Sequence, residues 1–505
     1  MSVRMFVLLL VTWSAGSSAA APFVIYGESS VHRTSDLVRG EVVSRRVAGH
    51  RGSMGAVNDA AAKGQPDAGQ WAALAHIGQA LPLGESGTLD PGAVFNPATV
   101  DGQGRAAFVA GVSGSPRNQG VFYSDAGELK LIAMGCGAGG GSGSTATCGD
   151  PTPVGGTFSG LFQGTVFAPA VNDAGDVLFY SDVAGGSSIR GLFLYRAATD
   201  DIIKIAAVGD PSPLGGNLSA IGPGSMNNRG RIVFLASTGG NGAQGSDVLL
   251  WKDGVVSKYV ATGDPAPGNQ SFLHIGTDAG GYADGTFIPD GPVPAINDNN
   301  EIAFYASTGS VEGHMLSRDG VHDWQIREGD PAPGGGYYFD LRGAPVLNGH
   351  GKIAFNAYTS DRPDGPITGG GWFVGSAGHY RRAIGFYDQL LDGELLGLAF
   401  SRNPFRPLDD GGNLILWASR RLGDNSFRET LVLARADGGV DVIASQGDPA
   451  PLGGQWRYFN PWMTTNNAFQ IQFGAESSDG GRFDAQFIAT HFVDGIFGYG
   501  FESGL

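Results

Sequence analysis

The chain has 505 residues, of which 85 are Gly and 27 are Pro. These two types make up about a fifth of the sequence, against roughly 12% in average proteins, and this excess excludes long helices. The 42% of hydrophobic residues can form a large core, and the 16% of charged residues excludes both wholesale disorder and a coiled coil. A formal net charge of −16 makes nucleic acid and anionic membranes poor partners. A turn-rich, all-β protein is the class that remains.

Residues 1–20 have the layout of a secretory signal peptide. Arg4 precedes an apolar run that ends at Trp13, and small residues follow up to Ala20. We therefore expect cleavage before Ala21 and an exported chain, in the periplasm, at the cell surface or outside the cell. The alternative is a short buried strand, because the run is too short to span a bilayer. No later stretch reaches the length of a membrane span, so none is expected in the mature chain.

The two cysteines, Cys136 and Cys148, flank a loop rich in Gly and Ser. In an oxidising compartment, two cysteines this close in sequence predict one local disulfide. It would stabilise the loop by roughly 2–3 kcal/mol. Metal binding by these thiols would need a His or carboxylate cluster nearby, and the local sequence offers none.

A first phrase, Gly-Asp-Pro-x-Pro, occurs five times. Its Asp residues are Asp150, Asp210, Asp264, Asp330 and Asp448. Degenerate copies around Gln79 and Asp388 bring the number to seven, spaced by roughly 60 residues. We expect each Asp to cap its own turn ahead of a Pro that fixes φ. The alternative is a ring of carboxylates around a common axis.

A second phrase, Asn/Asp-x-x-Gly-x-x-Ala/Val/Leu-Phe, alternates with the first and is also present seven times. Its copies occupy residues 101–108, 172–179, 227–234, 297–304, 348–355, 409–416 and 466–473. Asn300 and Phe469 replace the Gly in two of them. An Asn or Asp at the first position of a β-turn forms hydrogen bonds with the backbone that follows it. Gly at the fourth position allows the backbone conformation with which the chain leaves the turn. The phrase therefore predicts a hairpin.

Each repeat offers four apolar runs of strand length, which predicts a seven-bladed β-propeller over residues 71–493. The last repeat lacks its fourth strand, and an orphan strand at residues 71–77 precedes the first. We therefore expect the two ends of the chain to share one blade, in which 71–77 joins the strand at 485–492. Residues 21–70 form an N-terminal segment of uncertain structure, which leaves eight blades as the alternative, and 494–505 form a tail.

This pattern resembles a family of exported bacterial proteins with tandem Asn-x-x-Gly-x-x-Ala-Phe repeats and assorted C-terminal anchoring signals. The resemblance covers roughly residues 70–480, and Asn348 to Phe355 matches the motif in full. The family has no established activity. The resemblance therefore implies export and repetition, and no reaction.

The loops predict where a ligand could bind. In a propeller the Gly-Asp-Pro turns emerge on the same face as the variable loops at 111–120, 182–191, 237–247 and 360–371, and the loop between the cysteines joins them there. We expect this face to bind an extracellular protein or glycan without a cofactor. The alternative is a secreted polysaccharide hydrolase or lyase that uses carboxylates on the axial face.

A calcium site is a further alternative. An insertion in the fourth repeat contains Asp278, Asp284 and Asp290 among glycines, and Ca²⁺ accepts such oxygen ligands. Their spacing matches no defined calcium loop, so a solvated loop is favoured over a calcium-dependent adhesive protein. The nine His residues show no zinc spacing, and no Gly-x-Ser-x-Gly motif or phosphate-binding loop occurs. We therefore predict no catalytic residue.

Overall fold

The computed structural model describes residues 71–490, with gaps at 83, 91–97, 126–127, 137–148, 162–167, 240–246, 277–292, 364, 391–392, 399–406, 451–452, 462, 469 and 479–482. All described residues belong to one compact unit, Val57–Leu505. They form strands, turns and bends, without an α-helix. No helix that could cross a membrane is found among them. The expected signal peptide (1–20), the segment 21–70 and the tail lie outside the described residues.

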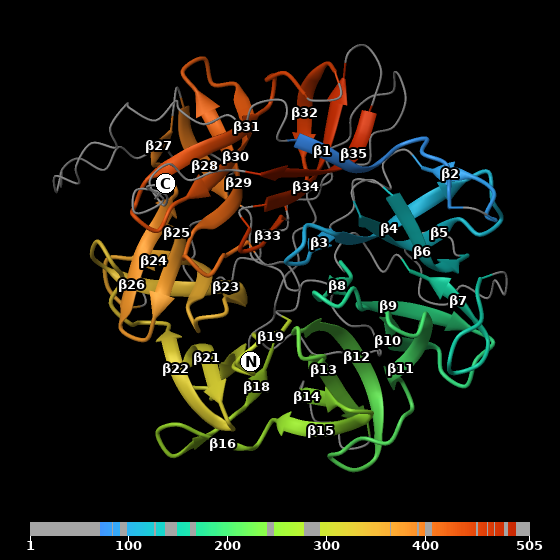
Figure 1. The fold of residues 1–505 in the computed structure, drawn as a ribbon. Coiled ribbons are helices and arrows are strands. Elements are labelled where there is room, and N and C mark those ends of the chain that lie inside the picture. Colours follow the sequence, from blue (N-terminus) through green and yellow to red (C-terminus); the bar gives the residue numbers. More distant parts are fainter. Residues whose placement is uncertain are drawn as a thin grey trace, which may run out of the picture. The chain divides into compact units, whose positions relative to one another are not determined.

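Seven antiparallel sheets stand in a ring around a central axis, so the fold is a seven-bladed β-propeller (Figure 1). Blade 1 contains β2 (Thr88–Leu89), β3 (Ala98–Val100), β4 (Ala106–Ser113), β5 (Gln119–Asp125) and β6 (Glu128–Gly135). Blade 2 contains β7 (Thr157–Gly160), β8 (Ala170–Val171), β9 (Val177–Ala184), β10 (Arg190–Arg196) and β11 (Asp201–Ala207). Blade 3 contains β12 (Asn217–Met226), β13 (Ile232–Gly239), β14 (Asp247–Lys252) and β15 (Val255–Val260).

The remaining blades follow in chain order. A short hairpin of β16 (Pro265–Ala266) and β17 (Gln270–Ser271) precedes blade 4, which contains β18 (His274–Ile275), β19 (Ala295–Ile296), β20 (Ile302–Ser307), β21 (Glu312–Arg318) and β22 (Val321–Arg327). Blade 5 contains β23 (Tyr337–Leu347), β24 (Ile353–Ser360), β25 (Ile367–Ser376) and β26 (His379–Gly385). Blade 6 contains β27 (Gln389–Leu390), β28 (Gly393–Leu398), β29 (Leu414–Leu422), β30 (Phe427–Ala434) and β31 (Val440–Ser445). Blade 7 contains β32 (Gln455–Phe459), β33 (Thr464–Thr465), β34 (Gln470–Ser478), β35 (Phe483–Thr490) and β1 (Trp71–His76).

Blade 7 is built from both ends of the described chain. β1 pairs antiparallel with β35, with Trp71 opposite Ala489 and His76 opposite Ala485. Ser124 of blade 1 also donates its hydroxyl to the Leu74 carbonyl oxygen, which ties β1 to the neighbouring blade. The expected closure is therefore confirmed. The alternative of eight blades is wrong, because β1 completes the seventh sheet and closes the ring.

The core consists of apolar clusters that each combine two adjacent blades. The two apolar positions that end the second phrase explain this arrangement. In blade 5, Phe355 packs towards blade 4, and its neighbour Ala354 packs towards blade 6. Successive side chains of a strand point to opposite faces of its sheet, so one short motif supplies both interfaces of a blade.

The antiparallel order gives the propeller two different faces. The links from strand one to strand two and from strand three to strand four emerge on one face, which we call the turn face. The links from strand two to strand three and from strand four to the next blade emerge on the other, which we call the loop face. The Asn/Asp-x-x-Gly turns lie on the turn face, and the Gly-Asp-Pro turns lie on the loop face.

Candidate functional site

The Asn/Asp-x-x-Gly turns have the geometry that their sequence predicts. The Asn348 side-chain oxygen accepts the backbone N–H groups of His350, at 3.1 Å, and Lys352, at 2.9 Å. The same two bonds recur in the turns that begin at Asp101, Asn172, Asn227, Asn297 and Asn466. Asn300, which replaces the Gly of the fourth copy, takes a φ of 62°, in the left-handed region that asparagine tolerates.

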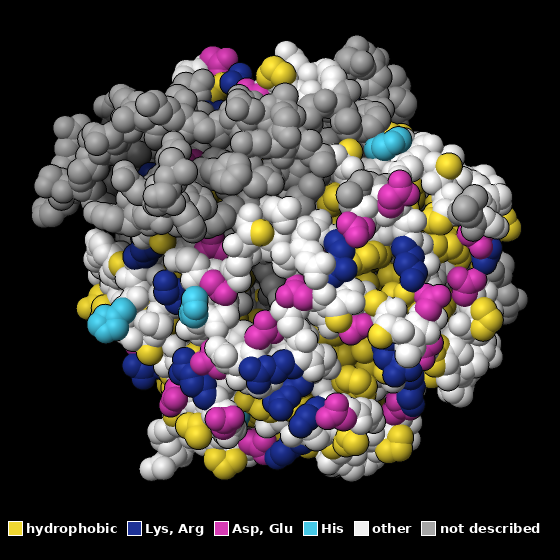
Figure 2. All heavy atoms as spheres, viewed as in Figure 1, with side chains coloured by type: hydrophobic (Ala, Val, Ile, Leu, Met, Phe, Trp, Pro, Cys, Tyr) yellow, Lys and Arg dark blue, Asp and Glu magenta, His cyan; other side chains and the backbone are white. Residues whose placement is uncertain are grey.

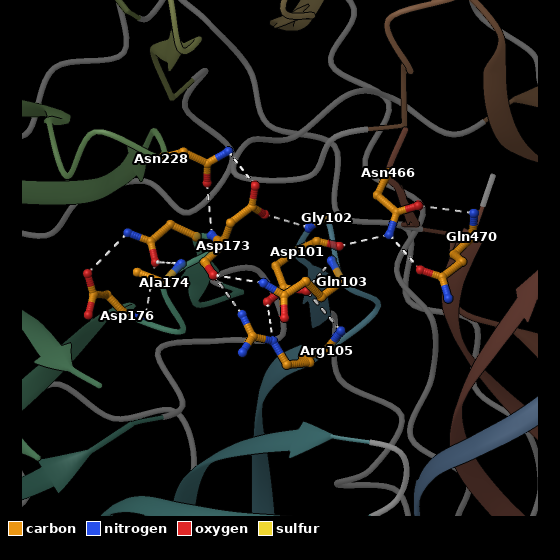
Figure 3. A network of polar contacts seen from close by, with 11 residues as sticks. Asp101, Gly102, Gln103, Arg105, Asp173, Ala174, Asp176, Asn228, Asn466 and Gln470 are labelled. Carbon is orange, nitrogen blue, oxygen red and sulfur yellow. Dashed lines mark hydrogen bonds and ion pairs between the residues drawn. The ribbon is translucent and has the colours of Figure 1, made fainter. Parts of the chain in front are cut away.

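These turns also bond to one another around the axis (Figure 3). Gly102 donates its backbone N–H to the Asp173 side chain at 2.7 Å, and Asp173 donates its own to Asn228 at 2.8 Å. Equivalent bonds join Asn228 to Asp298, Gly349 to Asp410, and Asp410 to Asn467. The carboxylates of these turns therefore accept hydrogen bonds from N–H groups of the protein. The resulting ring of turns, which we call the axial ring, joins neighbouring blades.

The Asp residues of the Gly-Asp-Pro turns are also engaged within the protein. Asp210 accepts the backbone N–H of Ala207 at 2.8 Å and the Lys204 ammonium at 2.7 Å. Asp150, Asp264, Asp330 and Asp448 accept the backbone N–H groups of Met134, Ala261, Arg327 and Ser445, and the first three of them also pair with a nearby Arg or Lys. Asp210, Asp264, Asp330 and Asp448 each cap their own turn, and Asp150 binds the end of the preceding strand, β6.

Several predicted site residues lie outside the described residues. They are Cys148 and the three candidate calcium ligands, Asp278, Asp284 and Asp290. Cys136 is buried at the end of β6, and the described part of the chain has no free cysteine. The disulfide stays a prediction. No group of three or more His, Cys, Asp or Glu among the described residues is placed to hold a metal ion.

The exposed apolar side chains of the described residues concentrate on the loop face. Of the eight large ones, only Val255 and Val321 lie in turns of the opposite face. The other six, at the loop-face ends of strands or in the links between them, are Ile189, Leu273, Ile367, Tyr387, Phe427 and Tyr458. Four of these six follow one another through blades 5, 6 and 7. Exposed apolar side chains that concentrate on one face indicate a surface that can bind a partner.

Ionisable side chains are buried at the same ends of the strands. In blade 2 the Arg190 guanidinium donates to the Asp182 carboxylate at 2.7 Å, and both side chains are less than one tenth exposed. In blade 3 Asp247 accepts the Thr262 N–H at 3.0 Å, and burial raises the pKa of its carboxyl to about 6. Because a buried charge is costly, such groups mark sites where function competes with stability.

Blade 4 carries two neighbouring carboxyl groups. Glu312, the first residue of β21, accepts the Tyr305 hydroxyl at 2.8 Å. Glu328, which follows β22, accepts the backbone N–H of Leu341 in blade 5 at 3.2 Å. Loss of solvent around the Glu328 carboxyl, together with the charge of Glu312, raises its pKa to about 7. The Glu328 carboxyl can therefore hold a proton near neutral pH.

Blade 6 carries a similar group at its border with blade 7. Glu429 accepts the backbone N–H of Phe459, from the inner strand of blade 7, at 2.9 Å. Burial raises the pKa of its carboxyl. These carboxyl groups and the exposed aromatic residues were not predicted from the sequence. Aligning the repeats on the start of their third strands is the signal that would have found Asp247 and Glu312, each the first residue of its strand, and Glu429, the third residue of β30.

Charges of both signs are interspersed on the molecular face that Figure 2 shows. The Arg and Lys residues of the described chain are largely paired with carboxylates, as in the ion pairs of Arg105 with Asp101 and of Arg318 with Glu301. A protein that binds nucleic acid through many phosphate contacts needs a continuous basic surface. The part of this face that the structure describes carries none.

Several solved structures are similar to the chain at low sequence identity. The β-propeller domain of the Trilobed protease from Pyrococcus furiosus has 9% sequence identity and a TM-score of 0.40, over 80% of this chain and 94% of that one. The polysaccharide lyase Uly1 has 11% identity and a TM-score of 0.41, over 83% and 97%. An ulvan lyase of family PL25 has 10% identity and a TM-score of 0.34, over 84% and 97%.

None of the curated proteins matches the chain. A family model, described as a family of unknown function (DUF7453), matches residues 138–315 and 273–390. The two matched regions overlap and together span residues 138–390, half of the chain. The chain therefore belongs to this family of unknown function.

Proposed function

We propose that the chain is an exported binding module that contacts an extracellular protein or glycan through its loop face. The observation that carries this proposal is the concentration of exposed apolar side chains there, six of the eight among the described residues. The turn face offers less to a partner, because the carboxylates of its axial ring already bind backbone N–H groups of the neighbouring turns. Rigid blades that present variable loops on one side suit such recognition.

A comparison of matched variants tests the proposal. The mature chain would be screened on an array of defined glycans and by pull-down with identified extracellular proteins. Phe427→Ser and Ile367→Ser remove exposed side chains of the loop face, and Val321→Ser removes one of similar exposure from the turn face. We expect the two loop-face variants to weaken any binding at least severalfold and Val321→Ser to leave it unchanged. Binding that only Val321→Ser weakens would refute a loop-face site.

A second candidate function, a polysaccharide hydrolase or lyase, is favoured by the neighbouring carboxyls Glu312 and Glu328. The Glu328 carboxyl, whose pKa is raised to about 7, can donate a proton at neutral pH, and Glu312 is the neighbouring carboxyl that would serve as the base. The Tyr305 hydroxyl, which donates to Glu312, would hold that base in place.

Activity measurements distinguish the two functions. Neutral, uronate-containing and sulfated polysaccharides would be incubated with the chain, and both new reducing ends and the ultraviolet absorbance of unsaturated uronate ends would be followed. Glu328→Gln should abolish any activity, and Glu128→Gln, at a turn-face end of β6, should retain it. Activity that survives Glu328→Gln would exclude this carboxyl as the acid.

A further inference from the structure

The loop-face edge of blade 6 brings four residues of neighbouring chain segments together in one row of the backbone. Phe427 lies opposite Arg421 in the pairing of β30 with β29, and Arg421 lies opposite Glu394 in the pairing of β29 with β28. The backbone of Tyr387 lies beside the same strand, because its N–H donates to the carbonyl oxygen of Leu395, next to Glu394, at 2.7 Å. Three steps of the usual strand spacing of about 4.8 Å separate the two aromatic residues by roughly 14 Å.

Tyr387 is both exposed and strained. Its side chain is 62% exposed. Its φ of 68° lies in the left-handed region, where a non-Gly residue other than Asn or Asp is rare. Glycine fills the equivalent position in five other repeats, with φ between 76° and 93°, at Gly78, Gly209, Gly263, Gly329 and Gly447. Backbone strain that the fold does not need is characteristic of functional sites.

Polar side chains lie on the strands beside Phe427 and further along its own strand. The Arg421 guanidinium pairs with the Glu394 carboxylate, and both side chains remain partly exposed. Glu429, two residues after Phe427 on the same side of β30, has one carboxylate oxygen on the Phe459 N–H. The Trp417 indole N–H is directed at the Glu429 carboxylate and opposes the rise in its pKa.

We propose that this row, Tyr387, Glu394, Arg421 and Phe427, is an oligosaccharide-binding subsite, an inference that rests on the loop-face binding proposed above. The faces of aromatic rings are negative, so they attract the weakly positive C–H groups on the face of a sugar ring. Carboxylate and guanidinium groups bind sugar hydroxyls as acceptor and donor. Two rings that stand about three strand spacings apart would hold separate sugar units of one chain.

The row suits a sugar chain better than a protein partner. The centre of a protein interface is apolar and depleted of charge. Here an ion pair occupies the centre, and the aromatic residues stand at its two ends. The pair is internally neutral, which fits a hydroxylated ligand and not a strongly charged one.

Four variants and an array of defined oligosaccharides test this subsite. Tyr387→Gly removes the ring and restores the glycine of the other repeats, so we expect an unchanged or higher melting temperature together with a loss of affinity of roughly tenfold or more. Phe427→Ser should lower the affinity similarly. Tyr387→Phe, which keeps the ring, and Val321→Ser, on the turn face, should bind like the original chain.

The outcomes separate this inference from the proposed function. Oligosaccharide binding that Tyr387→Gly leaves intact would overturn the subsite, and so would an array on which no oligosaccharide binds. If an identified protein partner then binds and Ile367→Ser weakens it, the loop-face proposal stands without the subsite. If the partner's binding is weakened only by Val321→Ser, both proposals fail.

Discussion

At the scale of single residues, Asp247 shows how a loop-face group affects stability. Its side chain is buried at the start of β14, and the Thr262 N–H is its hydrogen-bond donor. Burial raises the pKa of its carboxyl from 3.8 to about 6, with a small further rise from Asp264. The difference corresponds to about 3 kcal/mol between the protonated and ionised forms.

The sign of the pH dependence follows from this raised pKa. Between pH 3.8 and about 6 the folded chain binds the proton more tightly than the unfolded chain, so the contribution of Asp247 to stability is largest below this range and falls as the pH rises through it. Asp247→Asn keeps an acceptor for Thr262 and removes the charge. We expect it to raise the free energy of unfolding at pH 7.5 by about 2–3 kcal/mol.

Urea unfolding of both chains at pH 4 and pH 7.5 measures this effect. The gain from Asp247→Asn should be much smaller at pH 4, where the carboxyl is largely protonated in the folded chain. An equal gain at both values would show that the charge of Asp247 is not its cause.

At the scale of elements, the turn that begins at Asn348 does two tasks with one side chain. The oxygen accepts two N–H groups of its own turn, and the amide nitrogen donates to the Asp409 carbonyl oxygen of blade 6 at 3.0 Å. Asn227 and Asn297 donate in the same way to the next blade, at 2.9 and 3.0 Å. Asn is therefore favoured over Asp where a blade must be joined to its neighbour.

Two substitutions separate these tasks. Asn348→Ala loses the turn bonds and the bond to blade 6, so we expect it to lower the free energy of unfolding by about 2–3 kcal/mol. Asn348→Asp keeps the acceptor of the turn, but it replaces the donor by a buried carboxylate oxygen that faces the Asp409 carbonyl oxygen, so its cost should be at least as large. Chemical denaturation of the three chains measures both values. A loss for Asn348→Asp well below that for Asn348→Ala would show that the bond to blade 6 contributes little.

The sequence predicted what depends on local chemistry. Asn348 and Asp210 form hydrogen bonds with backbone groups only a few residues away, so their motifs predicted the turns. The spacing of the motifs predicted the blades. Contacts between blades depend on which strand of one sheet faces which strand of the next. The bonds from Gly102 to Asp173 and from Phe459 to Glu429 join residues far apart in sequence. No local pattern encodes such bonds, and neither does the exposure of Tyr387.

At the scale of the whole molecule, the ring is closed by one outer strand. β1 adds the fourth strand of blade 7, and its Ala75 and Leu74 are buried against blade 1. A chain that begins at residue 78 would leave the edge of β35 unpaired. We expect this truncation to lower the melting temperature strongly and to promote self-association, because an open edge pairs with other strands.

Thermal unfolding and size-exclusion chromatography of the truncated chain test the closure. A synthetic peptide of residues 70–78, added in excess, should restore much of the lost stability by occupying the edge of β35. A peptide with the same composition in scrambled order serves as the control. A truncated chain that melts like the full one would show that β1 contributes nothing to the ring.

The shared blade also determines when the propeller can close during synthesis of the chain. A ribosome makes β1, which ends at His76, long before β35, which begins at Phe483. The seventh blade can therefore form only after almost the entire chain has been made. The pairing of β1 with β35, which closes the ring, is among the contacts most distant in sequence. Such pairing is slow, because a long loop must be closed first. A ring that cannot close early stays open until the last blade has been made.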